Sequence, residues 1–282
     1  MNGTDAEEAF GPPLDARHLF AQARSALLDL LTGLGADEWD RPTAAAPWAV
    51  RDVVAHLVGD DVGRLSRSRD RHVAPAARPH ESLPELVHRL NHEWVTAAAR
   101  ISPVLLVDLL RTTTPQVMDF WQRVDLGALG EPVSWAGPGA APVWLDGARD
   151  FTEDWVHQQQ IRRALGRPGA DEPAMVHAVL ETFVRAVPYT LDRRAPAPGD
   201  GAPLTVHVPG PAGGTWTWRP SGKGWIWTRR AVPATTSVTL GADDLWKVCV
   251  RMIEPAEAAA RAEVHGDAHL ADAVLHTVSV IR

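Results

Sequence analysis

The spacing of apolar residues changes near residue 195 of this chain of 282 residues. Before that point, apolar residues recur every three or four positions, which is the spacing of one face of a helix. Beyond it, apolar and polar residues alternate in short segments such as Leu204–Val208 and Thr215–Trp218, as in strands with one buried face. The sequence therefore predicts an α+β protein, with a helical region followed by a small domain built on an antiparallel sheet.

The composition around the change of period predicts where one domain ends and the next begins. Segment 195–203, APAPGDGAP, has the proline and glycine content of a linker. A chain of 282 residues is also long enough for two domains of ordinary size. We expect a flexible N-terminus at 1–14, a helical domain at 15–194 and a C-terminal α+β domain at 204–282.

Capping residues and helix breakers locate the individual elements. Ser82 and Glu85 have the spacing of a capping box, and Pro84 falls in the first turn of the helix that follows. Helices are expected at 15–34, from residue 50 past residue 65, at 82–101, at 103–125 as one or two helices interrupted near Pro115, at 144–165 and at 172–191. A loop rich in glycine and proline is expected at 126–143. In the C-terminal domain we expect strands at 204–208, 215–218, 225–227 and 236–240, and helices at 242–253, 255–262 and 267–277.

Charge and cysteine content narrow the classes of function. A formal net charge of −7 argues against a general nucleic-acid-binding protein, which usually has a basic surface. No apolar run approaches the ~20 residues of a membrane span, and the N-terminus MNGTDAEEAFGPP lacks the features of a secretory signal. We therefore expect a cytoplasmic protein without a membrane partner. Cys249 is the only cysteine, so thiol chemistry requires either Cys249 or a thiol from outside the chain.

One pair of residues in the helix at 144–165 has the spacing of metal ligands. Glu153 and His157 are four positions apart, so their side chains lie on one helical face, about 40° apart around the axis. A carboxylate and an imidazole at this spacing bind one metal ion together in many helical proteins, although an exposed pair is the commoner occurrence. His56 lies at the edge of the apolar stripe of an earlier helix. It is either a boundary histidine bonded to a neighbour or a third ligand, and two histidines with one carboxylate suit a catalytic divalent metal, most often zinc.

A second group of acidic and imidazole side chains lies along the helix at 82–101. It consists of Glu81, Glu85, His88 and His92. The face opposite this group is apolar and is predicted to be the buried one, with Leu83, Leu86, Val87, Leu90 and Trp94. The second group is therefore expected on a solvated face, and the set with His56 is the preferred metal site.

Two segments resemble the sequence of a known family. PTAAAPWAVRDVVAHL at 42–57 is similar to the N-terminal signature of the mycothiol-dependent maleylpyruvate isomerase family, and FTEDWVHQQQIRRALGRP at 151–168 resembles that family's Glu-x-x-x-His motif followed by Ile-Arg and a glycine. In the first segment and the residues just before it, the matching positions are Trp39, Pro42, Thr43, Trp48, Val50, Arg51, Asp52, His56 and Leu57. The tail at 264–281 resembles the end of the family's C-terminal domain, which is similar to sterol-carrier proteins.

The resemblance implies a DinB-like four-helix bundle in which His56, Glu153 and His157 hold zinc or another divalent metal and form the catalytic site. It also implies that mycothiol is activated at the metal, adds to a double bond of the substrate, permits rotation and is then eliminated. The expected activity is that of an isomerase or thiol S-transferase acting on a small electrophile, by a monomer or weak homodimer. A non-enzymatic binding protein and a metal-dependent hydrolase are the alternatives. Arg251 lies where the family's C-terminal domain commonly has an arginine, and it is a candidate for binding an anionic cofactor.

The sequence also predicts the roles of several residues that differ from the family motifs or lie outside them. The family often has glycine where this chain has Pro47, and an acidic residue where it has Gln160. Asp60, one turn after His56, is expected to orient a ligand as a hydrogen-bond acceptor, and Asp61 requires a partner if it is buried. Cys249 is expected to be a packed core thiol. The alternating tryptophans of the C-terminal domain, Trp216, Trp218, Trp225 and Trp227, are expected to pack within the sheet rather than to bind a ligand.

Overall fold

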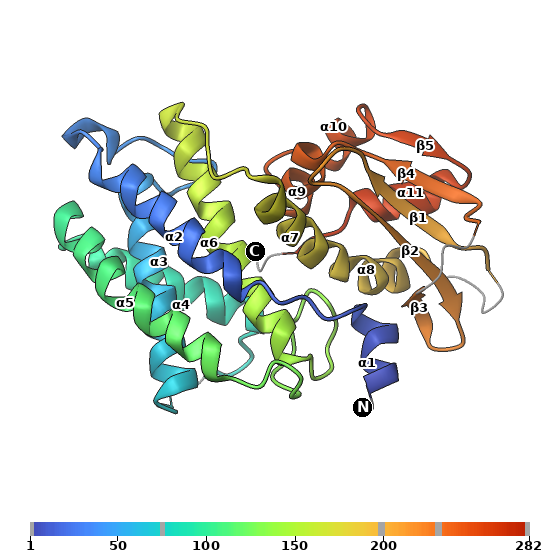
Figure 1. Cartoon of the computed structure of the whole chain (residues 1–282), viewed down its shortest axis with the longest axis horizontal. Helices are drawn as coiled ribbons and strands as arrows, with labels where there is room; N and C mark the ends of the chain where they lie inside the picture. Colours follow the sequence, from blue (N-terminus) through green and yellow to red (C-terminus); the bar gives the residue numbers. More distant parts are fainter. Residues whose placement is uncertain (1–2, 74–76, 197–200, 229–232, 280–282) are drawn as a thin grey trace. The chain divides into compact units, whose positions relative to one another are not determined.

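The computed structural model describes residues 3–73, 77–196, 201–228 and 233–279 of the chain (Figure 1). These residues form two compact units. A helical unit contains the described residues of 16–124 and residues 150–170, and a mixed unit contains 3–15, 125–149 and the described residues of 171–279. Helices and a sheet are thus separated along the chain, which confirms the predicted α+β class.

The helical unit contains α2 (Arg17–Thr32), α3 (Val50–Arg64), α4 (Leu83–Ala98), α5 (Pro103–Arg123) and most of α6 (Val143–Leu165). A 3-10 turn at Ala36–Glu38 precedes α3, and a π turn at Leu65–Arg69 follows it. The N-terminus of α3 is capped by Asp52, whose Oδ2 accepts a hydrogen bond from the N–H of Ala49 at 3.0 Å. The apolar faces of these helices meet in one core, which includes Leu27, Leu31, Val50, Val53, Val54, Leu57, Val58, Leu106, Leu110 and Ile161.

Helix α5 is continuous through Pro115, so the predicted interruption at this proline is wrong. Proline removes one backbone N–H donor and crowds the carbonyl four residues before it, which usually breaks or kinks a helix. Here the turns on both sides of the proline are held by burial of one face, with Leu110, Thr113, Val117 and Trp121 all buried. The burial of two consecutive turns on one side therefore outweighs the lost hydrogen bond.

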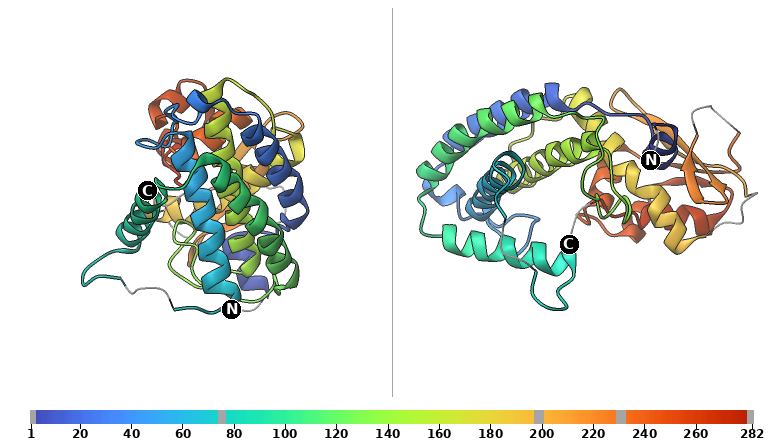
Figure 2. Two further views of the ribbon diagram at one scale, coloured as in Figure 1. Left: turned by 90° about the vertical axis from the view of Figure 1, so that its left-hand side faces the viewer. Right: turned by 90° about the horizontal axis from the view of Figure 1, so that it is seen from below.

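Helix α4 has the predicted capping box but not the predicted buried face. Ser82 accepts from the N–H of Glu85, and Glu85 Oε2 accepts from the N–H of Ser82 at 2.8 Å. Only Val95 and Ala98 of α4 are buried, whereas Leu83 is 48% exposed. The helix crosses α3 steeply, and only its C-terminal turns lie against neighbouring helices (Figure 2). Its first turns therefore have little to pack against.

Trp94 attaches α4 to α3. Its indole Nε1 donates to the backbone carbonyl of Ala55 at 2.7 Å. Gly59 provides the space for the ring, because a Cβ at this position would lie 2.6 Å from Trp94 Cδ1. The glycine is therefore required by a close approach between two helices.

The mixed unit is built on a five-stranded sheet with the order β3-β2-β1-β4-β5. The strands are β1 (Leu204–Val208), β2 (Gly214–Ser221), β3 (Gly224–Trp227), β4 (Thr236–Thr239) and β5 (Glu263–His265). The sheet is mixed and not antiparallel as predicted, because β1 and β4 pair in parallel. The antiparallel β2–β3 hairpin lies on one side of β1. Strand β4 lies on the other side of β1 and runs in the same direction as β1.

The helices of the mixed unit are α1 (Gly3–Phe10), α7 (Pro173–Phe183), α8 (Val187–Arg194), α9 (Ala242–Cys249), α10 (Pro255–Ala259) and α11 (Ala268–Leu275). The predicted helix at 172–191 is divided into α7 and α8 by a 3-10 turn at Val184–Ala186. Both helices belong to the mixed unit with the sheet, whereas the predicted helical domain at 15–194 included them. Trp216 Nε1 donates to Glu181 Oε1 at 2.7 Å, and the Trp225 N–H donates to Asp192 Oδ1 at 2.8 Å.

The predicted flexible N-terminus is helical over residues 3–10, and Phe10 is buried against Trp135 and Trp144. Residues 1–2 lie outside the described residues, as do positions 197–200 of the predicted linker.

The four sheet tryptophans are buried, as predicted. Trp218 and Trp227 are cross-strand partners whose ring centroids lie 5.1 Å apart. The guanidinium of Arg185 covers the Trp227 ring at 4.2 Å and forms an ion pair with Glu181 at 2.9 Å. The tryptophans therefore serve packing in this unit.

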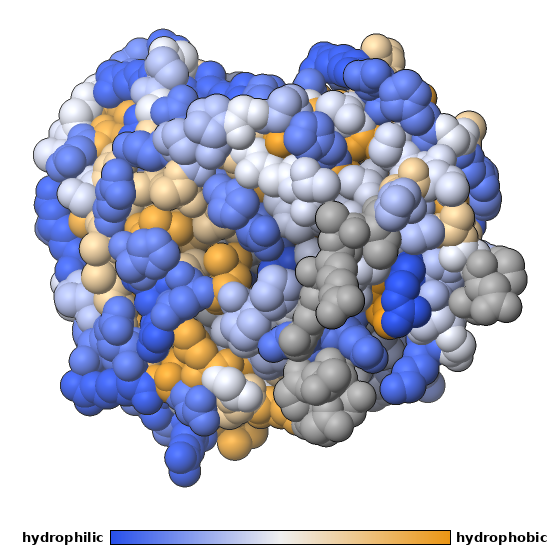
Figure 3. Space-filling view, turned by 45° about the vertical axis from the view of Figure 1, so that its right-hand side comes forward, coloured by the Kyte–Doolittle hydropathy of each residue, from blue (hydrophilic) through white to orange (hydrophobic). Residues whose placement is uncertain are grey.

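Apolar and hydrophilic side chains are interspersed on the face of the molecule drawn in Figure 3. Among the described helices, none has both the length and the apolar character that a membrane crossing requires.

The close approach at Gly59 yields a prediction about stability. Gly59→Ala is expected to lower the free energy of unfolding by about 1–3 kcal/mol, because the added methyl group collides with the Trp94 ring and overpacking of this kind costs that much. Gly63→Ala, in the same helix, is the matched control, since its Cβ would meet nothing closer than Arg67 Nη2 at 3.7 Å. The control is expected to gain up to about 1 kcal/mol from helix propensity. Urea unfolding measures both, and equal effects of the two substitutions would contradict the assignment.

Candidate metal centre

Two rows of ionisable side chains face each other between α3 and α6. His56, Asp60 and Arg64 succeed one another at four-residue intervals along α3. Asp150, Glu153 and His157 occupy one face of α6 at intervals of three and four residues. Both spacings follow the helical repeat, so each row lies along one side of its helix. The two rows meet in pairs, with His56 and Asp60 near Glu153 and Arg64 near Asp150.

The three predicted ligands converge on one point. Glu153 Oε1 lies 3.3 Å from His56 Nε2 and 3.1 Å from His157 Nε2. The ligand atoms of the three residues all lie within 4.8 Å of one another, and this is the only group of three or more metal-binding side chains in the described parts of the chain. The two imidazole rings are nearly perpendicular, at 80°, with centroids 4.7 Å apart. Each ring therefore directs its Nε2 toward the same space without stacking.

Gln160 fixes the orientation of His157. Its Oε1 lies 2.7 Å from His157 Nδ1, so the amide oxygen accepts the Nδ1–H, and the other ring nitrogen, Nε2, faces Glu153 Oε1 at 3.1 Å. Histidine ligands of metals commonly have such a partner on the ring nitrogen that does not bind the metal. On the other side, the ring of Trp48 lies 4.8 Å from that of His56. The neutral Gln160 thus takes the orienting role at the position where an acidic residue occurs in the resembling family.

Asp60 lies at the same ring nitrogen of His56 that faces Glu153, so it does not hold the ring from the other nitrogen. Its Oδ2 is 3.2 Å from His56 Nε2, the same atom that faces Glu153. A residue that orients a histidine from behind would instead contact Nδ1. The carboxylate of Asp60 therefore lies beside the group formed by His56, Glu153 and His157.

The charges of the site shift its protonation equilibria. Burial disfavours the charged form of His56, but the negative charge of Asp60 and the hydrogen bond and charge of Glu153 outweigh this effect and raise its pKa to about 9. Burial likewise opposes ionisation of Glu153, but hydrogen bonds from His157 and His56 and their charges hold its pKa well below the ordinary value. Burial and the neighbouring charges of Glu153 and Asp150 raise the pKa of Asp60 to about 6, against the opposing effect of the two histidines. In the absence of a metal, a proton on His56 balances the carboxylates.

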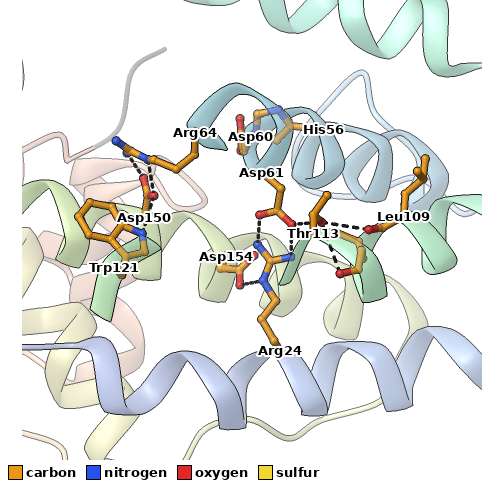
Figure 4. Close-up of polar contacts among 11 residues, drawn as sticks. Arg24, His56, Asp60, Asp61, Arg64, Leu109, Thr113, Trp121, Asp150 and Asp154 are labelled. Atoms are coloured by element: carbon orange, nitrogen blue, oxygen red, sulfur yellow. Dashed lines mark hydrogen bonds and ion pairs between the residues drawn. The ribbon is translucent and has the colours of Figure 1, made fainter. Parts of the chain in front are cut away.

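Behind this site, Asp61 has the partner that its burial requires. It is 2% exposed, and its Oδ1 and Oδ2 accept from Arg24 Nη2 at 2.7 Å and from Arg24 Nη1 at 3.2 Å. Thr113 of α5 donates its hydroxyl to Asp61 Oδ2 at 2.5 Å. The guanidinium also pairs through Nε with Asp154 of α6 (Figure 4). Sequence analysis predicted the need for a partner of Asp61 but identified neither Arg24 nor Asp154.

A second ion pair joins the same two helices at the other end of the rows. Arg64 forms a two-pronged contact with Asp150, in which its Nε donates to Asp150 Oδ2 at 2.8 Å. Trp121 Nε1 donates to the same oxygen at 3.2 Å, and Arg64 lies 4.9 Å from the centroid of the Trp121 ring (Figure 4). The pair is only partly exposed, so it tethers α3 to α6 more firmly than an exposed surface pair does.

The other candidate residues lie elsewhere and have other partners. Glu85, His88 and His92 are exposed, as predicted for the second acidic and imidazole group, whereas Glu81 pairs with Arg89 at 2.6 Å and is only 9% exposed. Cys249 is 1% exposed in the mixed unit, and burial raises the pKa of its thiol to about 12. Arg251 donates to the backbone carbonyls of Val248, His276 and Thr277 at 2.5–3.2 Å. Its role toward an anionic cofactor stays a prediction.

The helical unit, with its group of His56, Glu153 and His157, is a helical domain that carries a candidate metal centre. Residues 20–162, just over half of the chain, match the family model described as the mycothiol maleylpyruvate isomerase N-terminal domain. The matched segment includes His56, Glu153 and His157. The chain belongs to this family.

Relatives and a solved structure extend the likeness beyond the matched domain. The chain is 28% identical over 209 residues to the uncharacterized proteins MT0041 and Rv0036c of two strains of Mycobacterium tuberculosis, an alignment that covers 71% of this chain and 75% of each relative. A crystal structure of a point mutant of mycothiol-dependent maleylpyruvate isomerase aligns with 83% of this chain and 88% of that one, with a TM-score of 0.51 and 12% identity. At that identity, the structural likeness supports the fold alone.

The raised pKa of His56 yields a prediction about metal affinity. A metal must displace the proton of His56, so the apparent affinity for a divalent metal is expected to rise between pH 7 and pH 9, by up to about tenfold per pH unit. The rise should level off near the pKa of about 9. Competition titrations with a chelating dye across this range measure it, and calorimetry in buffers of different ionisation enthalpy counts the protons released.

His265→Gln is the control for this titration, because His265 lies in the mixed unit and is exposed. Its pH profile should match that of the wild-type chain. An affinity that does not change with pH above 7 would contradict the protonation state assigned to His56.

The same raised pKa of His56 adds stability to the metal-free chain below the ordinary value of 6.5, and this stability should be lost as the pH rises through about 9.

Proposed function

We propose that this chain is a zinc-dependent enzyme in which His56, Glu153 and His157 hold the metal, and that it uses mycothiol to isomerise a small electrophilic substrate or to transfer the thiol to it. The observation that carries the proposal is the convergence of these three side chains from two helices, within the segment that matches the isomerase-family domain. Two imidazoles and one carboxylate, with space for a further ligand, form the donor set of catalytic zinc sites.

The residues present fit a divalent cation. His56 Nε2 lies between two carboxylate oxygens, at 3.3 Å from Glu153 and 3.2 Å from Asp60, so the metal-free site concentrates negative charge around one nitrogen. His157 Nε2 faces the same place, and because Gln160 accepts the proton on Nδ1, the neutral ring would offer its Nε2 lone pair to a cation there. A divalent cation supplies the positive charge that ionises a thiol near neutral pH or polarises an acceptor oxygen.

The side chains around the ligands have separate roles in this proposal. Gln160 holds the His157 ring in its ligating orientation, and the Trp48 ring covers one side of His56 and limits access of water. Asp60 places its Oδ2 3.2 Å from His56 Nε2, beside the ligand group, where it would accept a hydrogen bond from the S–H or O–H of a bound thiol or water. The chain itself therefore supplies the ligands, their orientation and an acceptor for the incoming group.

The reacting thiol comes from outside the chain in this proposal. Cys249 lies in the mixed unit, whereas the metal ligands lie in the helical unit. Burial keeps its thiol protonated at neutral pH, because its pKa is raised to about 12. A thiol with this pKa and no exposed surface is a poor nucleophile.

Two single substitutions test the assignment of metal and thiol. His56→Ala is expected to lower bound zinc and to reduce thiol-dependent turnover by at least about a hundredfold, because the metal loses one of its three protein ligands. Cys249→Ser is expected to retain most of the turnover, apart from the effect of any loss in packing. Metal content by elemental analysis and turnover of a panel of electrophiles with saturating mycothiol measure these outcomes.

His92→Ala serves as the matched control, since His92 is an exposed histidine of the helical unit outside the ligand group. It should leave metal content and turnover unchanged. Loss of turnover in Cys249→Ser at an unchanged melting temperature, together with activity in His56→Ala, would contradict the proposal. Metal-dependent turnover of esters or amides without any thiol would instead identify a hydrolase.

A further inference from the structure

A buried cluster of ionisable side chains lies directly behind the candidate metal centre. Arg24 extends from α2 and places its guanidinium between Asp61 of α3 and Asp154 of α6 (Figure 4). All three residues are at most 6% exposed. Thr113 of α5 completes the cluster through its hydroxyl group. One guanidinium therefore joins three helices, and a fourth contributes a neutral donor.

The two aspartates immediately follow residues of the site in the sequence. Asp61 follows Asp60, and Asp154 follows Glu153. Successive side chains of a helix differ by about 100° in direction, so the aspartates point away from the site toward α2. Because a helical turn is rigid, holding Asp61 and Asp154 at fixed places also fixes the rotation of α3 at His56 and of α6 at Glu153 and His157.

The composition of the cluster indicates a role other than stability. Replacing a buried ion pair by neutral side chains of similar size is often neutral or stabilising, because the cost of removing charges from water is large. The cluster is also unbalanced, with two carboxylates for one guanidinium, and Asp154 Oδ1 is buried without a hydrogen-bond partner among the described residues. An arrangement with this cost is explained if it specifies how the helices meet.

We propose that Arg24 is a positioning residue of the metal centre, which sets the register of α3 against α6 through Asp61 and Asp154 and thereby sets the affinity and geometry of metal binding. This inference rests on the proposed function only in its assumption that His56, Glu153 and His157 bind a metal. The planar guanidinium is suited to the task, because its fork of donors holds two carboxylates in fixed directions, which an ammonium group does not do.

The experiment compares Co²⁺ binding by the full-length chain and three variants. Arg24→Met/Asp61→Asn/Asp154→Asn removes all charges of the cluster together, so no unpaired charge is left buried, and its melting temperature is expected to stay close to that of the wild-type chain. Arg24→Lys keeps the charge but not the fork, and it decides the question if the triple variant does not fold. Arg167→Met is the control, since Arg167 Nη2 contacts both carboxylate oxygens of Glu38, at 2.8 and 2.9 Å, in the same unit and away from both aspartates.

The Co²⁺ dissociation constant and visible absorption spectrum are the two measurements, and neither depends on enzymatic activity. The triple variant and Arg24→Lys are each expected to bind Co²⁺ about tenfold or more weakly, with an altered spectrum, as is usual when residues that support metal ligands are changed. Arg167→Met should differ from the wild-type chain by less than about twofold. A folded triple variant with wild-type affinity and spectrum would overturn the positioning role. A folded wild-type chain that binds no Co²⁺ would overturn the metal assignment itself, and the positioning role with it.

Discussion

The structure depends on the approach of α3 to α6, which brings two rows of ionisable side chains together inside an apolar unit. Val53, Val54 and Leu57 of α3 are at most 1% exposed, so the His56 imidazole projects from a helix whose other side is core. Burial of that core holds the two helices at packing distance, and the polar rows must then satisfy each other. They do so through Arg64 with Asp150 at one end, and through His56 with Asp60 and Glu153 at the other.

The members of the His56, Glu153 and His157 group could be predicted from the sequence because each rests on a local signal. Glu153 and His157 have helical spacing, and His56 lies in a motif that resembles the family signature. Arg24, Asp150 and Asp154 gave no such signal, since their partners are 29 to 130 positions away in the chain, and a helical pattern contains no information about which helices become neighbours. The burial of Asp61 did predict that some partner must exist.

The fold class was predictable because hydrophobic period reports secondary structure directly, and all five strands of the sheet lie beyond the change near residue 195. The parallel pairing of β1 with β4 was not, because the direction of pairing depends on the path of the connection between strands. Strand β5 (Glu263–His265) was missed because all three of its residues are exposed, so it has no buried alternation. For α7 and α8, the helical period was visible in the sequence, but their contacts with the sheet were not.

Gln160 shows what a departure from the family pattern changes at this site. A carboxylate on His157 Nδ1 would add a third acidic group close to Glu153 and Asp60 and would increase the basicity of the ring. The amide supplies the same hydrogen bond, at 2.7 Å, without the charge. The carboxylates of the site thus lie on the side of the ligand atoms, where Asp60 and Glu153 flank His56 Nε2, and the side behind His157 is neutral. The electrostatic attraction for a cation is therefore concentrated at the point where the three ligand atoms converge. The His157 imidazole is oriented by a neutral group, which does not compete for the cation.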